Sequence, residues 1–226
     1  MFELRSMLAA VALAGATSVA VAVPVTLIGT NIVVTYDDST LGLFGAPTLS
    51  GNSLSWAPTS FEALVNRAGP GGVGVNTATS TFAFNVTANP GWFLNTASLV
   101  SEAGSFSMSG ANALVVVSGD LKATPLPGTT VFTSPLGVPT FTSGLTGTWT
   151  AAAPAINLAP GTTESLISYR NQLTARVIGA GSASISKTSA TIDIAVTPVP
   201  EPGTFMMLLA GGAFVGFVAW RRRQSI

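Results

Sequence analysis

The sequence predicts an all-β protein, an antiparallel β-sandwich or jelly roll, with an apolar segment near each end of the chain. From residue 25 to residue 196, Thr, Ser, Val, Gly and Ala predominate, and apolar residues alternate with polar ones more often than they recur at helical spacing. Glycine and proline separate the short candidate strands. Because a strand with one apolar face must bury that face, two packed sheets are the expected architecture.

The clearest strand signal lies in residues 81–87, where Phe82, Phe84 and Val86 fall on one face. An Asn-Pro-Gly sequence follows and predicts a turn. Apolar and polar positions alternate again in the last long candidate strand, residues 183–196. The expected strands, in chain order, span residues 31–36, 53–56, 81–87, 113–118, 144–149, 172–178 and 183–196.

Four segments carry more specific expectations. Residues 113–118 are nearly all apolar, which predicts a strand that is buried on both faces. Residues 60–67 favour one or two helical turns, since a serine can cap the start and an early glutamate suits the helix dipole. A second short helix or turn is expected over residues 163–169. Residues 124–140 contain four prolines, which favours a long surface loop or an edge segment.

The C-terminal residues 199–226 form a distinct unit. An uncharged run over residues 205–220 would span about 24 Å as a helix, against roughly 30 Å for a bilayer hydrocarbon core. Snorkelling arginines and local thinning of the bilayer compensate for the short length. We therefore expect a single transmembrane helix over residues 204–220, with the basic end cytoplasmic and the preceding chain outside. The flanking residues are Val199, Pro200, Glu201 and Pro202 before the helix and Arg221, Arg222 and Arg223 after it.

The N-terminal residues 1–22 are typical of a signal peptide. A basic residue at position 5 precedes an apolar, alanine-rich run, and small residues lead up to Ala22. We expect signal peptidase to cut between Ala22 and Val23, with a cut after Ala20 as a close alternative. An uncleaved N-terminal membrane helix is the other interpretation. The secreted domain would then span residues 23–198.

The tail resembles the PEP-CTERM sorting domain of secreted Gram-negative bacterial proteins. The resemblance covers residues 199–223: the Pro200-Glu201-Pro202 tripeptide, a glycine, an apolar helix with small residues and a basic end. It implies a substrate of exosortase, a membrane-embedded cysteine protease or transpeptidase that recognises the tripeptide and removes or exchanges the tail. It also implies a transient inner-membrane anchor, followed by delivery to the periplasm, cell surface or extracellular matrix. The residues alone leave a permanent single-span anchor as the alternative.

Composition excludes several function classes. Residues 23–202 contain five basic and eight acidic side chains, a net charge near minus three, so nucleic-acid binding has no basic patch to use. The chain has no cysteine and no histidine. Disulfides, Ser-His-Asp and Cys-His catalysis, and the usual ligands of zinc, copper and haem are therefore excluded. We expect no cofactor and no enzymatic activity.

Three sets of residues remain as candidate sites. Asp37 and Asp38 follow a strand and could supply oxygen ligands to Ca²⁺, or simply form a solvated turn. A glycosidase needs two carboxylates at a fixed separation, whereas isolated acids favour scattered surface positions. Aromatic residues could form a sugar-stacking platform or belong to the core. The acids are Glu62, Glu102, Asp120, Glu164 and Asp193, and the aromatic residues are Tyr36, Trp56, Trp92 and Trp149.

These observations lead to one main hypothesis and one alternative. The main hypothesis is an exported cell-surface or matrix protein that an exosortase sorts and that has a structural role in exopolysaccharide or biofilm. The alternative is a carbohydrate-binding module at the cell surface.

Overall fold

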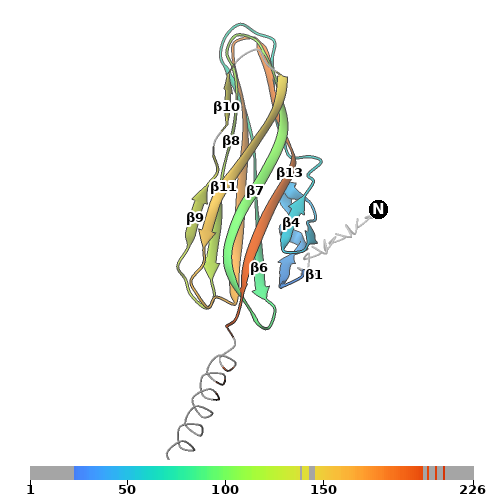
Figure 1. The fold of residues 1–226 in the computed structure, drawn as a ribbon. Helices are drawn as coiled ribbons and strands as arrows, with labels where there is room; N and C mark the ends of the chain where they lie inside the picture. The colour runs from blue at the N-terminus through green and yellow to red at the C-terminus, as the bar shows by residue number, and fades with distance from the viewer. Residues whose placement is uncertain are drawn as a thin grey trace, which may run out of the picture.

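The chain forms two antiparallel sheets that pack face to face. The computed structural model describes residues 23–137, 139–142 and 146–200, together with Gly203, Met207 and Gly211. In these residues the long strands run along the length of an elongated body, and the short N-terminal strands lie at one side (Figure 1). The expected class, an all-β protein built from antiparallel sheets in two layers, is confirmed.

The first sheet has seven strands in the order β1-β2-β6-β12-β8-β10, and β9 pairs with β8. Their bounds are β1 Pro24–Ile28, β2 Ile32–Asp37, β6 Val73–Ala88, β8 Ala113–Pro125, β9 Phe132–Pro135, β10 Thr140–Thr142 and β12 Glu164–Ile178. Two short 3-10 helices, η1 (Asp38–Thr40) and η2 (Gly42–Phe44), follow β2.

The second sheet has six strands in the order β11-β7-β13-β4-β3, and β5 also pairs with β13. Their bounds are β3 Thr48–Ser50, β4 Ser53–Trp56, β5 Glu62–Arg67, β7 Trp92–Ser109, β11 Thr146–Asn157 and β13 Gly181–Pro198. Strands β7 and β13 each contain 18 residues, which corresponds to about 60 Å of extended chain.

Consecutive long strands alternate between the two sheets. The chain leaves β6 in the first sheet and enters β7 in the second through the expected Asn-Pro-Gly turn, in which Trp92 N donates to Asn89 O at 3.0 Å. It returns to the first sheet between β7 and β8. Gly91 (φ 86°) and Gly110 (φ 95°) occupy left-handed conformations at these two crossings, which side chains with a Cβ rarely adopt.

Aromatic side chains fill the space between the sheets. The predicted inward face of Phe82, Phe84 and Val86 is confirmed, because all three are at most 1% exposed. Trp56 from the second sheet meets Phe82 from the first edge-on, with 5.4 Å between ring centroids. Such offset and edge-on contacts stabilise the core beyond simple burial of area.

The alternation of buried residues changes phase within β13. Alternate residues Ala183, Ile185 and Lys187 point into the core, and the buried positions then shift to Ala190 and Ile192. The pairing of β13 with β7 is irregular between Lys187 and Ser189. A bulge of this kind re-aims side chains locally, and it lets both halves of the strand bury their apolar residues.

The two predictions of short helical segments, over residues 60–67 and 163–169, are wrong. Residues 62–67 form β5, in which Ala63 is buried and Val65 half-buried, so the burial follows a period of two. Residues 164–169 begin β12, where Ser165, Ile167 and Tyr169 are buried in alternation. Pairing with a long neighbouring strand overrides the local capping signals in both segments.

Two further expectations need correction or refinement. Residues 113–118 do form a strand, but Ala113, Val115 and Val117 are buried while the residues between them are only half-buried. The proline-rich residues 124–140 include an edge segment of the first sheet, since β9 pairs with β8 there. The other expected strands correspond to β2, β4, the second half of β12, and β13. The segment predicted to begin at residue 144 appears as β11 from Thr146, and residues 143–145 lie outside the described residues.

Candidate functional sites

The first candidate site is the junction where β13 ends. The backbone N–H of Val199 donates to Gly91 O at 2.8 Å, which fixes the end of the sandwich, and Pro200 is exposed. A hollow of about 370 Å³ lies beside it, with Phe93, Leu158 and Pro200 among its lining residues. The start of the sorting tripeptide is therefore accessible at the tip of a well-packed domain.

Several predicted site residues lie outside the described residues. These are Ala22, Glu201, Pro202, Arg221, Arg222 and Arg223. Val23 is 53% exposed and directly precedes β1. Among the residues that the structure describes, no helix is long and apolar enough to cross a membrane. The expected span over residues 204–220 falls on described residues only at Met207 and Gly211.

The second candidate site is a polar cluster buried between the sheets. Glu102 on β7 and Lys187 on β13 come from the second sheet, while Tyr169 and Asn171 on β12 come from the first. Lys187 Nζ lies 3.0 Å from Glu102 Oε1. Asn171 Nδ2 donates to the same Oε1 at 2.6 Å, and Tyr169 Oη donates to Glu102 Oε2 at 2.6 Å. Lys187 Nζ also donates to Tyr169 Oη.

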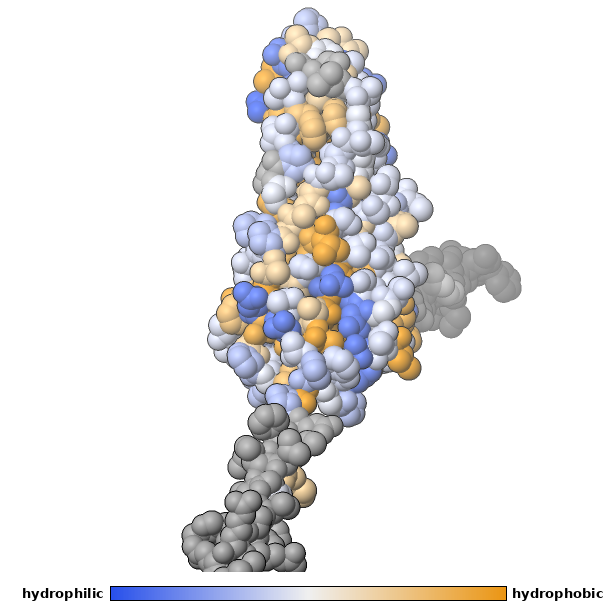
Figure 2. Space-filling view, viewed as in Figure 1, coloured by the Kyte–Doolittle hydropathy of each residue, from blue (hydrophilic) through white to orange (hydrophobic). Residues whose placement is uncertain are grey.

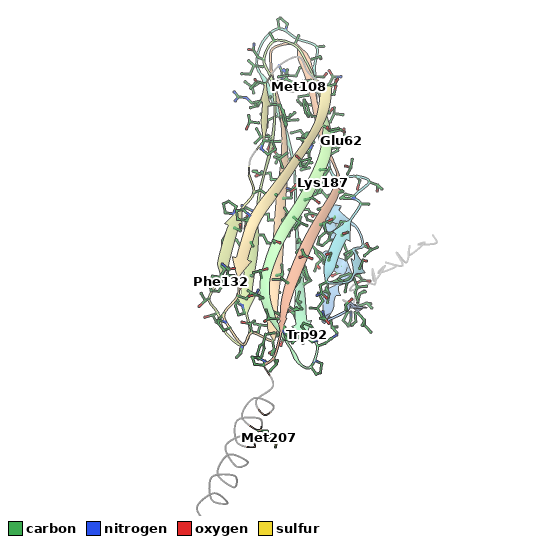
Figure 3. All side chains as sticks on the ribbon, in the orientation of Figure 1. Glu62, Trp92, Met108, Phe132, Lys187 and Met207 are labelled. Carbon is green, nitrogen blue, oxygen red and sulfur yellow. The ribbon has the colours of Figure 1, made fainter. Side chains whose placement is uncertain are left out.

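This cluster is sealed from solvent. The side chains of Glu102 and Lys187 are both 0% exposed. The Lys187 ammonium lies over three aromatic rings, at 4.5 Å from the centroid of Tyr169, 4.8 Å from Phe44 and 5.5 Å from Phe61. Figure 3 labels Lys187 about midway along the sandwich. Lys187 is in register with Gly104, and its side chain points inward in the same alternation as Ala183 and Ile185, before the irregularity that follows it.

Burial shifts the pKa values in the cluster. It lowers the pKa of Lys187 to about 8, although the neighbouring Glu102 carboxylate opposes this change. Burial raises the pKa of Tyr169 well above its usual range, and the charge of Glu102 adds to that effect. Asn171 Oδ1 is buried and has no hydrogen-bond partner among the described residues. The site therefore contains a lysine whose neutral form is unusually accessible, beside a carboxamide with a free acceptor.

Sequence reasoning missed this cluster. It placed Glu102 among scattered surface acids and did not single out Lys187, Tyr169 or Asn171. The signal was present in the strand periodicity, because Asn171 shares its phase with the buried Tyr169 and Leu173. A polar residue in the apolar phase of a long strand marks a buried site that needs a partner.

Three of the five candidate acids contact neighbouring side chains. Asp120 is largely buried and contacts Arg170 Nε at 2.7 Å and Lys122 Nζ at 3.2 Å. Asp193 accepts a hydrogen bond from Ser53 Oγ at 2.7 Å. Both Glu102 oxygens are occupied by neighbours in the core. Two of the acids expected at the surface are thus buried, and Glu102 has no route to an external polysaccharide.

The two consecutive aspartates form a turn. Asp37 Oδ1 accepts hydrogen bonds from Ser39 N at 2.9 Å and Ser39 Oγ at 2.7 Å, which caps η1. No group of three or more acidic residues suited to a metal ion occurs in the described part of the chain. This geometry supports the turn interpretation over the calcium hypothesis.

The four aromatic residues do not form a platform. Tyr36, Trp56 and Trp149 are at most 7% exposed, and Trp92 is half-buried near the end of the sandwich (Figure 3). Trp149 Nε1 donates to Ser186 O at 3.1 Å, so its polar atom is satisfied inside the protein. Three of the four residues belong to the core.

Comparison with known protein families identifies a motif at the C-terminal end of the chain. The described β-sandwich ends at a half-buried Val199 followed by an exposed Pro200. Residues 198–223 match the PEP-CTERM protein-sorting motif, and the chain therefore carries this motif at the position expected from the sequence. The motif indicates exosortase-dependent sorting of an exported protein that is transiently anchored through its C-terminus.

The other comparisons add little. No curated protein matches the chain. Among solved structures, the enzymatically active domain of tailspike protein 4 from bacteriophage CBA120 is 11% identical, with a TM-score of 0.18. That match covers 60% of this chain and 20% of the tailspike chain. At this level of similarity it carries no argument about fold or activity.

Proposed function

We propose that the protein is a structural, non-enzymatic component of the cell surface or extracellular matrix, embedded in exopolysaccharide or biofilm. Signal peptidase removes residues 1–22, the C-terminal helix holds the chain in the inner membrane, and exosortase acts at Pro200-Glu201-Pro202. The sorting motif at residues 198–223 is the observation that carries this proposal.

The path of β13 supports a structural role. This 18-residue strand pairs with β7 over nearly its whole length and leads directly into the sorting segment. Any load applied through the anchored end therefore enters a central strand rather than a peripheral one. Pale, weakly polar residues cover most of the face in Figure 2, with orange groups scattered among them. Such a surface is compatible with a hydrated polymer environment.

The processing step can be tested with matched glutamate variants. Wild type, Glu201→Gln and Glu62→Gln are expressed in an exosortase-containing strain and in a strain that lacks the enzyme. Glu62 is exposed on β5, far in sequence from the tripeptide, so its variant controls for loss of one acid. We expect wild type and Glu62→Gln to lose the tail only where exosortase is present, and Glu201→Gln to keep it. Intact-mass spectrometry of the purified proteins shows whether the C-terminal tail is present. A tail retained by wild type in both strains would contradict the proposal.

A further inference from the structure

We propose that Lys187 and Asn171 form an intramolecular amide bond across the two sheets, with Glu102 as the proton carrier. The product joins β13 to β12 through their side chains and releases one molecule of ammonia.

The geometry brings the two reacting groups to one carboxylate. Lys187 Nζ lies 3.0 Å from Glu102 Oε1, and Asn171 Nδ2 donates to that same atom at 2.6 Å. An amine and a carboxamide that share one acceptor are held side by side. Positioning of this kind removes much of the entropic cost of a reaction between two groups.

The surroundings make the neutral, nucleophilic form of Lys187 easier to reach. The pair is fully buried, and the cost of keeping two separated charges in a low-dielectric core is large. Transfer of one proton from Lys187 to Glu102 converts the ion pair into an amine and a carboxylic acid. The lowered pKa of Lys187 agrees with this direction. The three aromatic rings around Nζ exclude water, which would otherwise solvate the ammonium.

The reaction balances without any further reagent. The Nζ lone pair attacks Asn171 Cγ, and the Nζ–Cγ bond forms while the acid proton of Glu102 moves to Oδ1, the atom without a hydrogen-bond partner. Glu102 then takes a proton from Nζ and delivers it to Nδ2. The Cγ–Nδ2 bond breaks, ammonia leaves, and the Oδ1 proton returns to Glu102. Nothing is oxidised or reduced, and Glu102 ends as the carboxylic acid that the first proton transfer from Lys187 produced.

The position of this bond suits a chain without cysteine. The exported domain cannot use disulfides, because the sequence contains no cysteine. Lys187 lies on the strand that continues into the sorting segment, and Asn171 lies on a central strand of the opposite sheet. A covalent link here ties the anchored strand to the other layer of the sandwich.

Intact mass of the denatured full-length chain tests the proposal directly. We expect the wild type to be lighter than its calculated mass by one ammonia molecule. Trypsin should leave the chain uncut after Lys187 and yield a branched peptide that joins residues 171–176 to the peptide carrying Lys187. An unmodified mass, together with cleavage after Lys187, would overturn the proposal.

Three variants identify the reacting groups. Lys187→Met should show its full calculated mass, and Asn171→Asp should lose water instead of ammonia and reach the same product mass as wild type. Lys122→Met removes the exposed lysine that contacts Asp120 and should keep the deficit. A deficit that disappears in Lys122→Met would assign the modification elsewhere and contradict the proposal. The presence or absence of the branched peptide in the wild type tests the cross-link even where a variant fails to fold.

Discussion

Replacement of Glu102 by alanine should lower the free energy of unfolding by about 3–5 kcal/mol, because it leaves the Lys187 ammonium buried without its counter-ion. Tyr169 and Asn171 would also lose the acceptor that both of them use. The loss is best measured by denaturant unfolding in an Asn171→Ala background. In that background residue 171 has no carboxamide, so Lys187 keeps its charge, and the measurement reports the ion pair together with the Tyr169 hydrogen bond to Glu102.

The double variant Glu102→Leu with Lys187→Met is the matched control. It replaces both charges with apolar side chains of similar size, and it should recover a large part of the stability lost in Glu102→Ala. If Glu102→Ala stays within about 1 kcal/mol of its background, the ion pair does not stabilise the core in the way the structure indicates.

Replacement of Gly104 by alanine should destabilise the sandwich by about 3 kcal/mol. A Cβ at this position would overlap the Ser186 carbonyl of the neighbouring strand and lie 2.5 Å from Cε2 of Trp149. The Trp149 indole cannot retreat without breaking its hydrogen bond to Ser186. Because Gly104 pairs with Lys187 in the ladder, the shift would also disturb the buried cluster.

Gly69→Ala provides the control for this change. No atom lies within 4 Å of a Cβ built at Gly69, so its stability should change by no more than about 0.5 kcal/mol. Thermal or denaturant unfolding of the two variants side by side measures the difference. Equal stabilities would show that the indole does not pack against the strand as described.

The fold class and the inward face of β6 were predictable, because alternation of Phe82, Phe84 and Val86 is a local property of the sequence. The pairing of strands was not. Residues 62–67 contain helix-start signals, yet they form a strand. That strand pairs with β13, which lies more than a hundred residues later in the chain. Register shifts such as the one after Lys187 depend on the partner strand, so the local sequence does not reveal them.

The same limit applies to the sites. The sorting motif is contiguous, so its residues could be identified directly from the sequence. The buried cluster draws Glu102, Asn171 and Lys187 from three strands in two sheets. Their separate positions gave no hint of a common site, although Asn171 in the buried phase of β12 was a detectable anomaly.

The location of the folded domain is the central claim, and a reporter enzyme that is active only outside the cytoplasm tests it most directly. The reporter is fused immediately upstream of Val199 in the full-length chain, so that both terminal segments stay in place. We expect reporter activity outside the cytoplasm, and loss of that activity when residues 1–22 are deleted. A fusion that remains inactive, with the intact protein recovered only from the cytosol, would contradict export and with it the role of the sorting segment.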